Sequence, residues 1–184
     1  NPDAVIGERH PQMVACETFL GQPIRKFDGV KAEGEIAPRA PWARAWLTHL
    51  RRLDGVEDAI SQGERYVLDG LVWHLEVDRG EMVGVVLGSQ LHAQRVSISP
   101  ISREREAALI DVCRDRVGDV THVVTGRLPR DVFTAFTDPD EGLFPREEDI
   151  SYRCSCSAGR EGALCKHIAA VLLGFVERLE RRSR

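Results

Sequence analysis

Several features that would place this chain in a common class are missing from its 184 residues. No apolar run approaches the roughly 20 residues that a membrane-spanning helix needs, and the start of the chain shows no basic segment followed by an apolar one, the pattern of a secretory signal. Aromatic residues make up only 6% and methionine occurs twice. With 42% hydrophobic and 29% charged residues, the composition predicts a soluble globular protein of one or two small domains.

The usual sequence motifs of catalysis are missing as well. We find no nucleophile elbow, no glycine-rich phosphate loop, no His-Glu-x-x-His motif and no pair of carboxylates spaced for acid–base work. The acidic cluster at 138–142 lacks the ligand alternation of an EF-hand loop, so we expect a solvated turn there. The sequence therefore predicts a protein that is not an enzyme and has no small-molecule substrate.

Cysteine is scarce, with five residues, but three of the five lie close together near the carboxyl end. Cys154, Cys156, Cys165 and His167 follow the pattern Cys-x-Cys, an eight-residue gap, then Cys-x-His. Three thiolates and one imidazole complete the tetrahedral shell of a structural zinc site. The alternative is four unrelated buried side chains, because free cysteine packs like a small hydrophobic residue. Four such ligands within fourteen residues favour zinc.

The two other cysteines, Cys16 and Cys113, are far apart in the sequence and have no ligand-like neighbours. This usage indicates a reducing, cytoplasmic setting and not a disulfide framework. Two histidines in opposite strand segments, His74 and His92, could form a second metal pair. No cysteine or carboxylate cluster accompanies them in the sequence, so we expect only one metal site.

The residues around the four ligands predict the elements that hold them. Cys154 and Cys156 have the spacing of side chains on the same side of a strand. Cys165 and His167 stand where a helix is expected to begin, after a loop that contains two glycines. Residues 146–184 therefore predict a ββα unit held by one metal ion. The apolar positions of its helix recur at spacings of three and four and are Leu164, Ile168, Val171, Leu172, Phe175, Val176 and Leu179.

Charge is unevenly distributed along the chain, whose net charge is −4. From Tyr152 onward there are seven basic and three acidic residues, so this segment carries +4 and the rest carries −8. A basic finger on an acidic body indicates an anionic partner, although the basic residues could also be an ordinary solvated face. The candidate nucleic-acid contacts are Arg153, Arg160, Lys166, Arg178, Arg181 and Arg182.

Two of these basic residues have a second interpretation. Arg153 and Lys166 stand next to ligands in the sequence. Three thiolates and one Zn²⁺ leave a formal charge of −1, which neighbouring cations can offset. A structural role for these two side chains is therefore as well supported by the sequence as a contact with phosphate.

The chain before the cysteines is expected to form an arm and a body. Residues 1–40 contain four prolines and several glycines and indicate an arm, with a short helix at 11–20, that packs on the body or on a partner. The stripe from Pro41 to Leu53 predicts a helix in which Trp42 and Trp46 are core anchors. A short helical piece is expected at 56–62.

A small antiparallel sheet is predicted between Tyr66 and Ser99. Apolar residues alternate with others in three to four segments, and Asp78-Arg79-Gly80 supplies one turn. Gly84, Gly88 and Ser89 would let another backbone come close, either at a ligand surface or at a bulge, and we expect a bulge. The fold class is therefore α+β: an arm at 1–40, a body at 41–145 with flanking helices, and the finger at 146–184. Further elements are expected after Ser102 (helix), at 121–126 (strand or helix) and at 130–136 (helix).

The segment CSC, eight residues, then CKHIAAVLLGF resembles a SWIM-type zinc finger, whose pattern is CxC…CxH running into an apolar helix. Three segments, PWARAWLTHL, QGERYVLDGLVWHLEVDRGEMVGVVLGS and GLFPREEDISYRCSCS, are similar to a family of bacterial SWIM proteins, so the resemblance covers roughly residues 41–184. It implies zinc as the cofactor, bound by Cys154, Cys156, Cys165 and His167, and a role in binding DNA or protein. Such relatives are often encoded beside a Swi/Snf-type helicase-like ATPase, which becomes the candidate partner.

Two functional hypotheses follow. In the first, the chain is a non-enzymatic adaptor, an accessory subunit of a helicase-like ATPase acting on DNA, whose basic finger touches phosphate. In the second, it is purely a protein–protein interaction module, with the finger's helix and the arm as the interface. No residues are placed for reading base edges, so the first hypothesis predicts binding without sequence preference.

Overall fold

The computed structural model describes residues 10–116 and 128–182, apart from the side chains at 115, 116, 160 and 161. The predicted α+β fold is confirmed, with an antiparallel sheet and flanking helices. By their contacts the residues form two compact units: unit 1 lies within Asn1–Ile98 and Ser151–Arg184, and unit 2 is Ser99–Ile150. The boundaries expected at residues 40 and 145 stay predictions, and the contacts group the chain differently.

Unit 1 is organised by a four-stranded sheet in the order β1-β2-β3-β4. The turn between the first two strands is the predicted one, and its residues Arg79 and Gly80 have φ values of 39° and 80°. Positive φ at both positions is what a type I′ turn requires, one of the two turn types that suit two-residue connections between twisted antiparallel strands. The fourth strand comes from the carboxyl-terminal segment. The strands are β1 (Val72–Asp78), β2 (Glu81–Leu87), β3 (Leu91–Ile98) and β4 (Ile150–Cys154).

Two expectations about the start of the sheet are wrong. Residues from Tyr66 to Leu68 belong to a helix, α4 (Glu57–Leu68), and not to a strand. The bulge lies at Trp73, where the pairing shifts between Val72 and His74, and not at Gly84. Gly84 is instead a place of close approach, because a Cβ there would collide with the side chain of Val171.

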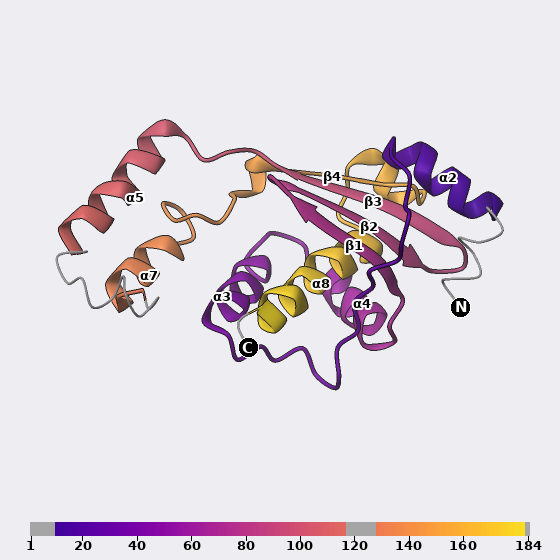
Figure 1. The fold of residues 1–184 in the computed structure, drawn as a ribbon, viewed down its shortest axis with the longest axis horizontal. Helices are drawn as coiled ribbons and strands as arrows, with labels where there is room; N and C mark the ends of the chain where they lie inside the picture. Colours follow the sequence, from indigo (N-terminus) through magenta and orange to yellow (C-terminus); the bar gives the residue numbers. More distant parts are fainter. Residues whose placement is uncertain (1–9, 117–127, 183–184) are drawn as a thin grey trace. The chain divides into compact units, whose positions relative to one another are not determined.

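Different helices cover the two faces of the sheet (Figure 1). On one face lies α2 (Pro11–Leu20), which confirms the short helix expected at 11–20. Its side chains Met13, Cys16 and Leu20 pack into a core with residues of the second and third strands, Val83, Val85, Leu91 and Ala93. On the other face lie α3 (Pro41–Leu50), α4 and α8 (Lys166–Arg182).

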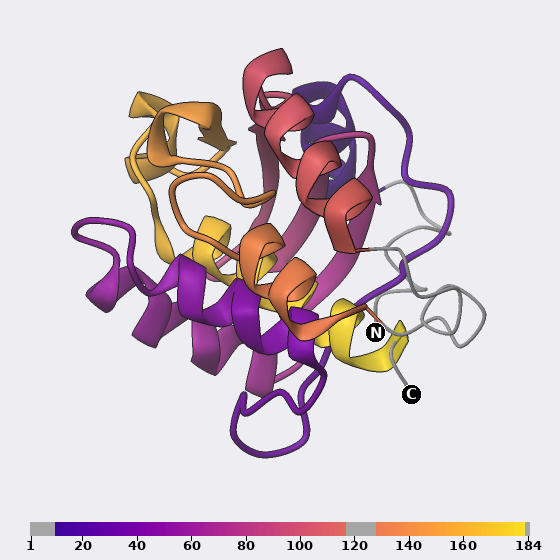
Figure 2. The same cartoon turned by 90° about the vertical axis from the view of Figure 1, so that its left-hand side faces the viewer.

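The helix α8 forms the centre of this second face. It packs against α3, α4 and three strands of the sheet, and Figure 2 shows the purple α3 and the magenta α4 beside the yellow α8. At Gly63 of α4 the backbones come so close that a Cβ would lie 2.8 Å from both the Ala169 Cβ and the Ala170 nitrogen. Ten of the seventeen residues of α8 are buried, so the finger's helix belongs to the core of unit 1.

The arm is held against unit 1 along its described length, 10–40. Val30 forms an isolated β-bridge with Val72. The backbone N–H groups of Arg39 and Ala40 donate hydrogen bonds of 2.9 and 2.7 Å to the buried carboxylate of Glu180 in α8. This carboxylate therefore ties the two residues that precede α3 to α8. One of the two sequence interpretations, an arm packed on the body, matches these contacts.

Unit 2 contains α5 (Arg103–Arg116) and α7 (Arg130–Phe136), both expected from the sequence. The hydroxyl of Ser102 accepts a hydrogen bond from the Arg105 nitrogen, as predicted for the start of α5. The buried Arg105 donates to the Phe144 carbonyl oxygen at 2.6 Å. At 138–142 the Asp138 carboxylate accepts from two backbone nitrogens, which makes the expected turn. The strand or helix predicted at 121–126 lies outside the described residues.

Within the described residues, none of the helices combines the length and the apolar character that crossing a membrane would require.

Candidate metal centre

The four predicted ligands lie together in one cluster, with all ligand atoms within 4.8 Å of one another. The Cys154 sulfur is 3.9 Å from His167 Nδ1, and the Cys156 and Cys165 sulfurs are 3.6 Å apart. Zinc–sulfur bonds of about 2.3 Å in a tetrahedral shell would separate two sulfurs by about 3.8 Å. The residues present therefore fit zinc, as the sequence predicted.

Three elements of the chain carry the ligands. Cys154 is the last residue of β4, and Cys156 lies in the turn that follows, so the two cysteines do not share one strand as the spacing suggested. The turn aims Cys156 back at the cluster, where its sulfur accepts a hydrogen bond from the Gly159 nitrogen at 3.2 Å. Any residue other than glycine at position 159 would place its Cβ in collision with Cys154. Cys165 and His167 stand at the start of α8, as predicted.

The surroundings favour a negatively charged sulfur at Cys165. The start of α8 carries the positive end of the helix dipole, which stabilises thiolates close to it. Hydrogen bonds from Cys154 and His167 lower the pKa of the Cys165 thiol. The pKa of Cys154 is raised, because its proton serves the hydrogen bond to Cys165 and because the group is buried. A divalent cation at the centre would remove this competition for protons, since metal binding releases them.

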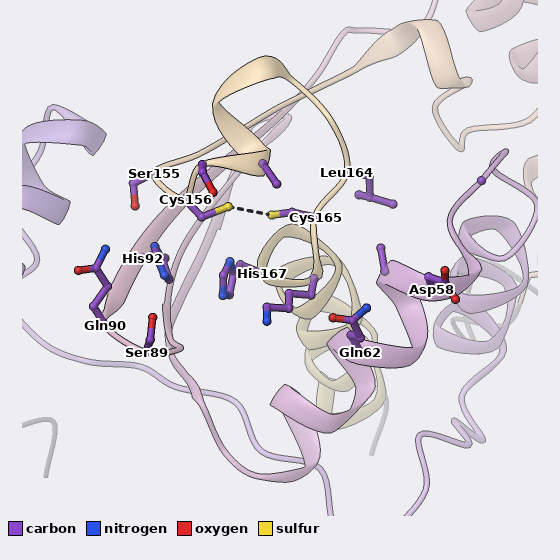
Figure 3. A pocket seen from close by; sticks show the side chains of 15 residues that line it. Asp58, Gln62, Ser89, Gln90, His92, Ser155, Cys156, Leu164, Cys165 and His167 are labelled. Atoms are coloured by element: carbon purple, nitrogen blue, oxygen red, sulfur yellow. Dashed lines mark hydrogen bonds between the residues drawn. The ribbon is translucent and has the colours of Figure 1, made fainter.

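The His167 ring is held by packing on both sides. Tyr66 of α4 meets it edge-on with ring centroids 5.3 Å apart, and the His92 ring of β3 lies 4.4 Å away. Figure 3 shows His92 and His167 facing one another. The Nδ1 atom faces Cys154 and would be the ligand atom. The Nε2 atom is buried and has no hydrogen-bond partner among the described residues.

His92 was not predicted to lie at the metal centre. Burial, and then the charge of His167, lower the pKa of His92, which favours its neutral form beside the cluster. The alternation of β3 offered one signal that His92 points toward the finger's helix. His92 and Gln94 share a face of the sheet with Gly84, where α8 comes close. The strand that pairs with β3 on its other side is β4, which carries Cys154, and that pairing was not readable from the sequence.

A cavity of about 750 Å³ opens beside the metal centre (Figure 3). The ligands Cys156, Cys165 and His167 form part of its wall, and Lys166 lines it as well. The rest of the wall mixes polar and apolar residues. It comes from α4, from the turn between β2 and β3, and from the finger's loop, with Asp58, Gln62, Ser89, Gln90, Ser155 and Ser157.

The candidate nucleic-acid contacts whose side chains are described do not form one surface. Lys166 begins α8 and Arg178 lies twelve residues later, so a rise of 1.5 Å per residue separates them by about 18 Å. Arg153 is exposed on β4 and lies over the Phe19 ring of α2. The side chain of Arg160 lies outside the described residues.

The basic residues near the end of α8 hold the arm. Arg178 donates to the carbonyl oxygens of Asp28 and Leu75 and forms an ion pair of 2.6 Å with the Asp28 carboxylate. Arg181 donates to the Lys31 carbonyl oxygen at 2.8 Å. These contacts give two of the predicted phosphate-binding residues a structural role, and Arg182 next to them is exposed.

Three cysteines and one histidine that fill a tetrahedral shell, between the end of a strand and the start of a helix, define a structural zinc-binding module. Residues 147–173 match the family model of the SWIM zinc finger, so this segment of the chain is a SWIM zinc finger, as its pattern indicated. A module of this kind binds and does not catalyse.

The chain is also similar to an uncharacterized protein of Mycobacterium tuberculosis, Rv2102. The two are 26% identical over 155 residues, which cover 81% of this chain and 54% of that protein. The chain thus spans about half the length of this curated relative. No solved structure matches the chain.

Proposed function

We propose that the chain is a zinc-dependent adaptor without catalytic activity that contacts nucleic acid at its finger end, as an accessory subunit of a helicase-like ATPase acting on DNA. The observation that carries this proposal is the SWIM finger itself, whose closed shell leaves the metal no open position for chemistry. Zinc would be held by the three cysteines and His167 and would fix the shape of the loop and helix start around it.

The proposal assigns the phosphate contacts to Lys166 and Arg153 and not to the end of α8. Lys166 lies at the cavity, half-buried, with its ammonium over the Tyr66 ring. Neither Lys166 nor Arg153 makes an ion pair with any residue whose side chain is described. Arg178 and Arg181, by contrast, already use guanidinium donors on backbone carbonyls of the arm. Cations that are not neutralised by a protein carboxylate are the ones available to phosphate.

Replacing the two finger cations tests this assignment. Arg153→Gln combined with Lys166→Gln is expected to weaken binding to duplex DNA and to lower the slope of log affinity against log salt by about 1.8, since each phosphate contact contributes about 0.9. Fluorescence anisotropy with labelled duplexes of unrelated sequence measures both quantities. Comparable affinity for the unrelated sequences is also expected, because nothing in the finger is placed to read base edges.

A matched control removes two exposed arginines elsewhere in unit 1, Arg52→Gln with Arg65→Gln. This variant should keep the salt slope of the unchanged protein. An unchanged slope in the finger variant, or no binding of the unchanged protein at low salt, contradicts a nucleic-acid contact at the finger. That outcome would leave the purely protein-binding alternative.

The protein-binding alternative placed its interface on the finger's helix and on the arm. Most of α8 is buried between the sheet, α3 and α4, and the described part of the arm is pinned to unit 1. These contacts use much of the surface on which the alternative placed its interface. We therefore keep the nucleic-acid adaptor as the leading proposal.

The helicase-like ATPase is proposed as the partner from the family resemblance. We expect a tagged chain to recover an ATPase of this class from a native extract under gentle conditions, at close to one copy per chain. Size-exclusion chromatography of the same extract is the independent measurement. A chain that elutes as a monomer and captures no ATPase contradicts the partner assignment and leaves the DNA contact as a separate question.

A further inference from the structure

Strand β3 presents two polar side chains to the interior of unit 1, His92 and Gln94. They occupy alternate positions, so both point toward the face covered by α8. Gln94 is completely buried, with 0% of its surface exposed, and the residues of β2 that line this face opposite it and on either side are Gly84, Val86 and Met82. A buried carboxamide is unfavourable unless its polar atoms find partners. The partners of Gln94 therefore indicate why a polar side chain stands there.

The amide nitrogen of Gln94 donates two hydrogen bonds. One goes to the His92 carbonyl oxygen at 2.8 Å, and the other goes to the Cys154 sulfur at 3.5 Å. Both partners are acceptors, and a zinc-bound cysteine carries negative charge. The reverse orientation would place the amide oxygen against a carbonyl oxygen and a thiolate. The two acceptors thus fix which end of the amide faces the metal centre.

The amide oxygen of Gln94, unlike its nitrogen, makes no hydrogen bond among the described residues, although it is buried. Gly84, directly opposite in the pairing of β2 and β3, leaves room for this oxygen, since a Cβ there would lie 3.2 Å from it. An apolar side chain of the same length would fill this space without an unsatisfied oxygen. Packing alone does not account for a glutamine at this position.

We propose that Gln94 is a positioning residue of the zinc centre, whose N–H orients the Cys154 thiolate and disperses its charge. Hydrogen bonds to ligand atoms from outside the ligand set orient the ligands and tune the metal's affinity. Gln94 lies outside residues 147–173, which match the finger. The functional zinc centre therefore includes the strand β3 of the sheet, and the finger segment is incomplete without it.

The test replaces Gln94 by methionine, which has a similar length and no N–H donor. Gln94→Met is expected to lower the affinity for zinc by about 10-fold to 100-fold, the range seen when such outer hydrogen bonds are lost. Competition with a chromophoric chelator measures the affinity. The matched control is Gln90→Met, which changes an exposed glutamine in the turn between β2 and β3 and should keep the original affinity.

A second readout separates this hydrogen bond from a general loosening of the core. With Co²⁺ in place of zinc, loss of an N–H donor raises the energy of the sulfur electrons, so the sulfur-to-cobalt charge-transfer band should move to lower energy in Gln94→Met. A folded Gln94→Met that keeps both the affinity and the band position overturns the proposal.

A measurement on the unchanged protein covers the case in which the variant does not fold. Exchange of zinc for cadmium should shift the side-chain amide NMR signals of Gln94 and leave those of Gln90 in place, because only Gln94 donates to a ligand sulfur. Gln94 signals that do not respond to the exchange contradict the proposed bond.

Discussion

Cys165→Ser is expected to unfold the whole of unit 1 in one transition. The apparent binding free energy of a structural zinc is about 10–16 kcal/mol in finger peptides, comparable with the roughly 5–15 kcal/mol that stabilises an ordinary domain. The helix that begins after Cys165 supplies the core between α3, α4 and the sheet. Loss of its anchored start therefore removes packing from every layer of the unit.

Two tryptophans on opposite faces of the sheet can follow this transition. The Trp46 indole nitrogen donates to the Leu172 carbonyl oxygen of α8, and its ring meets Phe175 at 5.5 Å. Trp73 packs with Phe27 on the face covered by α2. Urea unfolding of variants that keep one of these tryptophans at a time, with phenylalanine at the others, should give coincident midpoints.

The control for this experiment is Cys113→Ser, which changes a half-exposed cysteine of unit 2. It should leave the stability of unit 1 unchanged. A Cys165→Ser protein in which the signal of Trp46 is lost while that of Trp73 stays native would contradict a shared core. It would support the separate finger that the sequence considered at 146–184.

Gly63→Leu is expected to destabilise unit 1 by about 3 kcal/mol or more. Leucine is a better helix former than glycine by nearly 1 kcal/mol, so an isolated α4 would gain. In the structure, however, even a Cβ at this position would lie 2.8 Å from the Ala170 backbone nitrogen, and helix backbones cannot yield as a flexible side chain can. Overpacking of this kind typically costs about 1–3 kcal/mol, and leucine adds three more carbons.

Ser61→Leu is the matched control, because Ser61 is an exposed residue of the same helix. It should leave the urea midpoint nearly unchanged or raise it slightly. If Gly63→Leu is as stable as Ser61→Leu, the close crossing of α4 and α8 is not present in solution.

Patterns local in the sequence predicted the local structure well. The ligand spacing identified the zinc cluster, and Pro41 followed by periodic apolar residues identified α3. The start of β1 was misplaced because Val67 is in phase with the alternating apolar residues that follow it, Leu71, Trp73, Leu75 and Val77. The buried positions of α4 are Ile60, Gly63 and Val67, and a glycine in the middle of that stripe gives no hydrophobic signal.

Contacts between distant segments could not be predicted. Gln94 and Cys154 are 60 positions apart in the chain, and the Arg39–Glu180 hydrogen bond joins positions 141 apart. No periodicity in either segment marks its partner. The same reason explains why Arg178 and Arg181 looked like free cations: the carbonyl oxygens that they bind belong to the arm and to β1.

The central claim is that one zinc ion, held by Cys154, Cys156, Cys165 and His167, organises the core of unit 1. Metal analysis of the purified chain, combined with Trp46 fluorescence during titration with a strong chelator, tests it most directly. We predict one zinc per chain and loss of the native Trp46 signal in step with removal of the metal. A chain without stoichiometric zinc, or one whose Trp46 signal persists after complete chelation, would contradict the account.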